Sequence, residues 1–267
     1  MLKQTLIALG ILAVAGTAAA ADITNPFYLP TKGQLGSITS ADFTRGQYKS
    51  NWNEDARSYD TNVTEELQYG LTDSLALIAN IGNTFSKVKF LDDGSYTTDK
   101  EDKNIAWETG LAWNIFNKAF KLQAALAYGQ DQLDNRYQDQ EGMGEFKYVA
   151  GTIRAGYQFA KMLPYVEVGE LLPVAQKKGA DKPTYTGKIG LYQGKCETWA
   201  LDTGIRVTHD ANTEYKGTTY DAEVEASYYL TKKSAVSVYG TYTLKGFAKT
   251  QADIYNKSAG VRLRWYF

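Results

Sequence analysis

The feature that most limits the fold of this chain is a long-range alternation of apolar and polar residues. From Ile105 to Ile115, almost every second residue is apolar or aromatic, and the residues between them are small or polar. Successive side chains of a β-strand point to opposite faces, so this pattern predicts a strand with one apolar and one polar face. The same alternation recurs over 199–207, 220–230 and 255–267. We therefore expect an all-β fold.

The connections between the expected strands also alternate, in length. Five are short (71–73, 117–119, 160–163, 194–196, 231–234) and six are long (46–57, 89–103, 131–145, 175–184, 209–218, 246–254). Outer-membrane barrels have short periplasmic turns and longer external loops. We therefore predict a transmembrane antiparallel up-and-down β-barrel over 34–267, with about twelve strands and ten to fourteen possible. The expected strands are 34–45, 58–70, 74–88, 104–116, 120–130, 146–159, 164–174, 185–193, 197–208, 219–230, 235–245 and 255–267.

A soluble barrel such as a lipocalin would alternate in the same way, and two observations argue against it. About eight strands already enclose an interior that side chains fill, so twelve strands around an apolar interior would leave a large void. Aromatic residues also lie near both ends of expected strands, as Tyr59 and Tyr69 do. Rings at both ends of a span are typical of the two membrane–water interfaces.

The first 21 residues differ from the rest. Lys3 is followed by an apolar stretch over 6–14 and by small residues up to Ala21. This order predicts a secretory signal peptide over 1–21, cleaved after Ala21. A membrane anchor is the alternative, but the stretch is too short to span ~30 Å of hydrocarbon. Residues 22–33 then form a periplasmic N-terminal segment, which two prolines lead us to expect in an extended form.

Composition excludes several classes of partner and chemistry. A net charge of −1 gives no reason to expect nucleic-acid binding. The single cysteine, Cys196, cannot form an internal disulfide, and we interpret it as incidental. The long connections are acidic, as in 89–103 and 131–145, but neither matches the spacing of an EF-hand. We expect no metal site and no cofactor, although divalent ions could link these loops to lipopolysaccharide.

The last ten residues carry the most specific motif. They run from Ser258 to a terminal Phe267, with a glycine and then apolar or aromatic residues at alternate positions. This stretch resembles the carboxyl-terminal β-signal of Gram-negative outer-membrane barrels. The resemblance implies recognition by the barrel-assembly machinery and insertion among outer-membrane lipids. The residues that carry the assembly signal are Gly260, Leu263, Trp265 and Phe267.

The sequence does not favour an enzyme. Outer-membrane lipases need a His–Ser pair, because serine is a poor nucleophile without a base. Omptin proteases use an Asp–His pair, and His209-Asp210 stands at an expected external strand end. Adjacent strand residues face opposite sides, however, and His209 is the only histidine of the chain. We therefore assign no catalytic residue.

The polar face of the expected strands carries charges of both signs. A charge inside a barrel needs water or a partner. Opposed acidic and basic rows across a wet pore would select solutes, whereas charges that pair would plug the lumen. We expect a small passive, porin-like channel for small polar solutes, of zwitterionic or anionic character. A closed structural or adhesive barrel is the alternative, and an outer-membrane hydrolase is the third. The pore-lining candidates are Asp60, Glu66, Glu108, Arg154, Lys188, Asp202, Arg206, Glu223, Glu225, Arg262 and Arg264.

Overall fold

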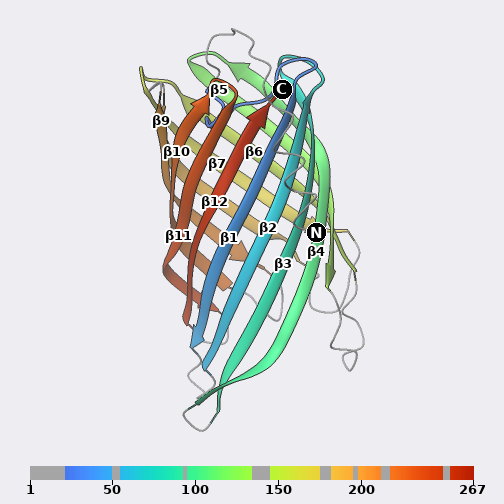
Figure 1. The fold of residues 1–267 in the computed structure, drawn as a ribbon, viewed down its shortest axis with the longest axis vertical. Helices are drawn as coiled ribbons and strands as arrows, with labels where there is room; N and C mark the ends of the chain where they lie inside the picture. Colours follow the sequence, from blue (N-terminus) through green and yellow to red (C-terminus); the bar gives the residue numbers. More distant parts are fainter. Residues whose placement is uncertain are drawn as a thin grey trace.

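A computed structural model gives the fold as one closed antiparallel barrel of twelve strands (Figure 1). It describes residues 22–49, 55–92, 95–133, 145–174, 182–194, 198–211, 217–248 and 253–267. The strands are β1 Leu35–Lys49, β2 Asp55–Gly70, β3 Leu75–Asp92, β4 Ser95–Asn117, β5 Phe120–Leu133, β6 Glu145–Tyr157, β7 Met162–Pro173, β8 Thr184–Gln193, β9 Trp199–Asp210, β10 Gly217–Thr231, β11 Ser234–Ala248 and β12 Asp253–Tyr266. The predicted fold class and strand number are confirmed.

Each strand pairs with its neighbours in the sequence, and the last strand pairs with the first. The closing seam between β1 and β12 is long, with Gly36 opposite Tyr266 at one end and Lys49 opposite Asp253 at the other. The blue first strand accordingly lies beside the red last strand in Figure 1. Closure leaves no unpaired sheet edge, which a membrane-spanning sheet requires.

The two ends of the barrel differ in the length of their connections. At one end, which we call the turn end, β2 and β3 are joined by four residues and β4 and β5 by two. At the other end, the loop end, five connections span four to eleven residues, but β3 and β4 are joined by only two. Several strands extend further toward the loop end than the sequence indicates. The expected loop 89–103 is largely strand, because β3 continues to Asp92 and β4 begins at Ser95.

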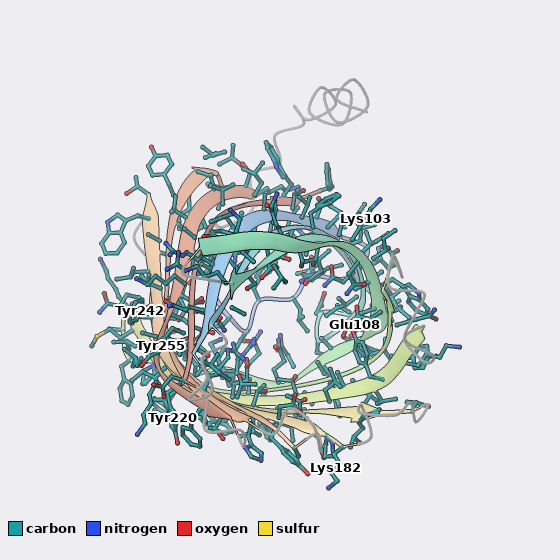
Figure 2. The ribbon with its side chains drawn as sticks, turned by 90° about the horizontal axis from the view of Figure 1, so that it is seen from below. Lys103, Glu108, Lys182, Tyr220, Tyr242 and Tyr255 are labelled. Carbon is teal, nitrogen blue, oxygen red and sulfur yellow. The ribbon has the colours of Figure 1, made fainter. Side chains whose placement is uncertain are left out.

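The predicted alternation gives the barrel two distinct surfaces. Outward side chains are apolar and exposed, for example Ile189 (71% exposed), Val238 (63%) and Leu126 (62%). Figure 2 shows Tyr220, Tyr242 and Tyr255 on the outside of the ring and Glu108 on its inner side. The apolar groups therefore face away from the interior, opposite to the arrangement in a soluble barrel.

The predicted signal peptide (1–21), Cys196 and most of the acidic segment 131–145 lie outside the described residues. Within the described ranges, no helix is long and apolar enough to cross a membrane.

Candidate functional site

The N-terminal residues 22–34, which we call the crossing segment, lie inside the turn end of the barrel. The segment contains turns rather than the extended backbone that its prolines suggest. Its first anchor is polar. The hydroxyl of Tyr229 donates to Asp22 Oδ1 (2.5 Å), and Thr24 Oγ1 lies 2.7 Å from the hydroxyl of Tyr192. These tyrosines belong to β10 and β8, so the segment begins against that wall.

The middle of the segment is held by Phe27, which is only 2% exposed. Its ring meets that of Tyr165 edge-on, with centroids 6.2 Å apart, and the guanidinium of Arg154 stacks over it at 5.8 Å. Its carbonyl oxygen accepts a hydrogen bond from Asn114 Nδ2 (3.1 Å). Arg154 also donates to the carbonyl of Pro26. Side chains from β4, β6 and β7 thus fix the segment in the lumen.

The segment then turns toward β2. Tyr28 packs edge-on against Tyr266 at 4.7 Å, and its hydroxyl donates to Gln34 Oε1. Burial raises the pKa of Tyr28 to about 12, so the ring stays neutral. Gly70 lets the backbones meet, because a Cβ there would stand 1.9 Å from the carbonyl oxygen of Thr31. The segment therefore spans the turn end from one wall to the other, and the blue trace crosses the ring in Figure 2.

Above the crossing segment, an ion-pair network covers the lumenal wall from β6 to β10. Glu167 on β7 accepts from Arg154 Nε (2.8 Å) and, through its other oxygen, from Arg206 Nη1 (3.3 Å). Arg206 continues to Glu223, with Nε 2.6 Å from Oε1. Glu167 is only 7% exposed, and its carboxylate is compensated on both oxygens.

The network extends through Lys188 on β8. Its Nζ lies 2.8 Å from Glu223 Oε2 and 3.7 Å from Asp202 Oδ2. The hydroxyl of Tyr165 donates to Asp202 Oδ2 (2.9 Å). Every charge in this group has a partner from a neighbouring strand or from one strand beyond it. The pairs therefore run along the wall and do not bridge the lumen.

A second group lies near the seam. Glu225 on β10 pairs with Arg262 and with Arg264 Nη1 (2.6 Å), both on β12. Arg262 Nε also donates to Ser40 Oγ on β1 (3.0 Å), and Arg264 donates to Ser237 Oγ (2.7 Å). The charges of the last strand are thereby tied to both of its neighbours.

The opposite wall is polar, and no ion pair is seen among its described lumenal residues. Glu66 on β2, Asn80 on β3 and Glu108 on β4 stand directly opposite one another in adjacent strands. Gln68 Nε2 donates to Glu66. Toward the loop end, Asp60 accepts a long hydrogen bond from Ser58 (3.4 Å).

Between the two walls is a cavity of about 530 Å³. Nine of the eleven pore-lining candidates border it: Glu66, Arg154, Lys188, Asp202, Arg206, Glu223, Glu225, Arg262 and Arg264. Glu108 and Asp60 also face the lumen by the alternation of their strands, outside this cavity. The inner surface thus brings together acids, bases and amides around space that a small solute can fill.

Three contributors to the site were not predicted. Glu167 was missed because the alternation of apolar and polar residues around it is short, although Val166 and Val168 flank it as outward residues would. Lumenal tyrosines such as Tyr165 were missed because aromatic residues were assigned to the membrane side. The crossing segment was missed because its partners are distant in sequence, as with Asp22 and Tyr229.

The predicted assembly signal occupies the end of β12. Leu263 and Trp265 stand opposite Thr39 and Ser37 of β1, and the backbone N–H of Phe267 donates to the carbonyl of Leu35 (2.8 Å). Gly260 faces inward, and a Cβ there would stand 2.6 Å from the ring of Tyr239. The glycine therefore makes room for a lumenal tyrosine.

The enzyme interpretation receives no geometric support. His209 faces outward on β9, where Nδ1 lies 2.8 Å from Thr218 Oγ1. Asp210 follows it and faces the other side of the sheet. Among the described residues, no group of three or more His, Cys, Asp or Glu side chains is arranged to hold a metal ion.

Comparisons with known proteins give structural likeness only. No family model and no curated protein matches the chain. Its fold is similar to that of an outer-membrane channel from Pseudomonas putida F1, with a TM-score of 0.68 and 13% identity, over 92% of this chain and all of that one. It is also similar to the translocator domain of the autotransporter NalP from Neisseria meningitidis (TM-score 0.55, 13% identity, 90% and 91% covered). A third is the toluene transporter TbuX from Ralstonia pickettii (TM-score 0.50, 13% identity, 94% and 96% covered). This chain therefore has the fold of an outer-membrane β-barrel.

Proposed function

We propose that the protein is a passive outer-membrane channel for small polar solutes, with the crossing segment as the constriction at its periplasmic end. The observation that supports this most directly is the lumenal cavity of about 530 Å³ with its charged lining. A barrel that serves only as a structural element does not need a hollow polar interior.

The two walls offer complementary contacts to a solute. The wall from β6 to β12 presents paired charges of both signs, which keep the surface wet. The facing wall presents carboxylates and amides. The Oδ1 atom of Asn80 is buried in this wall and receives no hydrogen bond from the described residues. Small molecules with both donors and acceptors, such as zwitterions, fit this arrangement best.

The channel and the transporter among the similar structures support the channel part of this proposal. Their likeness supports the architecture, and the lumen of this chain supports the polarity of the solute. The orientation follows from the connections, since short turns are periplasmic in such barrels.

A closed structural barrel is the second candidate. The observation in its favour is the crossing segment, whose anchors on β2, β4, β6 and β10 obstruct the turn end. In that case the cavity would be a water-filled pocket with no exit.

Single-channel recording in planar bilayers separates the two. Full-length mature protein with a heat-modifiable gel shift, which reports a folded barrel, is inserted and current is recorded in symmetric salt. The channel proposal predicts discrete steps in the current. The frequency or duration of these steps should rise in a variant whose crossing segment is held less tightly. Absence of steps in the native protein and in a loosened variant, with both folded, would support the structural barrel.

A further inference from the structure

The carboxylate of Glu65 is on the outer, lipid-facing side of the barrel. Glu65 on β2 lies between Val63 (43% exposed) and Leu67 (45%), which both point outward. Because side chains two residues apart share a face, Glu65 points outward as well. It accepts hydrogen bonds from two outward hydroxyls of β1, Ser37 Oγ (2.6 Å) and Thr39 Oγ1 (2.5 Å). We call these three residues the outer polar site.

The site lies at the turn-side edge of the apolar band. Ser37 is the strand partner of Trp265, whose ring type is common at the membrane interface. Ser37 is only two residues from Leu35, which is the strand partner of Tyr69. In a strand tilted by about 40°, two residues span roughly 5 Å along the membrane normal. The Glu65 side chain leans toward this edge, because one of its oxygens reaches Ser37. The carboxylate is therefore level with the head groups of the periplasmic leaflet.

The site lacks a positive charge. Within the described residues, no lysine or arginine pairs with Glu65, and outward basic side chains such as Arg45 and Lys257 lie toward the loop end. Each carboxylate oxygen has one hydroxyl partner and keeps a free lone pair. A carboxylate next to hydrocarbon is costly unless a cation compensates it. A hydrogen-bonding cation would compensate the charge and use the free lone pairs at the same time.

We propose that the outer polar site binds the primary ammonium head group of a phospholipid in the periplasmic leaflet. The ammonium donates to Glu65, and the acyl chains lie along the apolar side chains above it, such as Val63 and Val261. A second copy of this chain is a poorer occupant, because a twofold contact would place two Glu65 carboxylates together.

Native mass spectrometry of the detergent-solubilised barrel tests the proposal. Phosphatidylethanolamine and phosphatidylglycerol with identical acyl chains are added separately, and the fraction of lipid-bound protein is measured. We expect the native protein to prefer phosphatidylethanolamine by about fivefold, the ratio that corresponds to about 1 kcal/mol for an accessible ion pair. Glu65→Gln should remove this preference, since glutamine keeps the shape and loses the charge.

The matched control is Glu170→Gln, which removes an outward carboxylate near the loop end of β7 and should leave the preference intact. A heat-modifiable gel shift checks that both variants are folded. Equal binding of the two lipids by the native protein would overturn the proposal. So would a preference that survives Glu65→Gln, or a protein dimer that depends on Glu65.

Discussion

Replacing Phe27 with alanine should release the crossing segment from the lumen without unfolding the barrel. The ring is 2% exposed and packs against Tyr165 of the wall. Truncating a buried phenylalanine to alanine costs about 3–5 kcal/mol. None of the barrel's strand hydrogen bonds depends on the ring, so this cost falls on the docking of the segment.

Each 1.4 kcal/mol changes an equilibrium tenfold, so the ratio of released to docked segment should rise by roughly 10² to 4 × 10³. The anchors at Asp22 and Tyr28 remain, and they keep the segment from leaving permanently. In single-channel recordings we expect Phe27→Ala to open more often or for longer than the native protein in the same salt.

The matched control is Phe43→Ala, the same change at an outward position of β1 that is 50% exposed. It should leave conductance as in the native protein. If Phe27→Ala and the native protein give the same current, the crossing segment does not limit conduction, and the reasoning from its burial is wrong.

Three further predictions follow from the lumen and the seam. Glu167→Gln removes the carboxylate partner of Arg154 and leaves Arg206 paired with Glu223 alone. It should lower the unfolding free energy by about 1.5–3 kcal/mol in urea titrations followed by gel shift, whereas Glu170→Gln should change it by less than about 0.5 kcal/mol. Channel opening should increase between pH 10 and 12. The Tyr28 hydroxyl has a pKa near 10 when the crossing segment is released and of about 12 when it is docked, so rising pH favours the released form. Tyr28→Phe should show a smaller increase in opening. Phe267→Ala should reduce the amount of folded barrel recovered from the outer membrane of expressing cells, with Phe247→Ala, another outward phenylalanine, as the comparison.

Most of the barrel could be predicted because its pattern is local. The alternation around Trp107 and Trp113 identifies both faces of β4 from a dozen residues. The lumenal set follows from the same period of two, and the expected strand order puts Glu225 and Arg262 two strands apart on the face where they form an ion pair. Strand ends toward the loops were predicted less well, since a strand that leaves the membrane no longer needs an apolar face.

The crossing segment could not be predicted because nothing periodic marks it. Phe27 reads as one apolar residue among prolines, and its environment is built by side chains 87 or more residues away, such as Asn114. The geometry of the ion pairs could not be predicted from the sequence either. Alternation tells which charges face inward, but the choice between pairing along the wall and across it depends on strand tilt and side-chain reach.

The anchors of the crossing segment also have a mechanical consequence. A closed sheet resists stretching along its hydrogen bonds but bends readily, so a ring of twelve strands can flatten into an oval. The segment joins β10 at Tyr229 to β4 at Asn114 and to the end of β2 at Gly70, three separated points on the circumference. It therefore limits how far these three parts of the wall can move apart at the turn end. At the loop end, no segment crosses the lumen among the described residues. We therefore expect the cross-section of the barrel to vary more at that end.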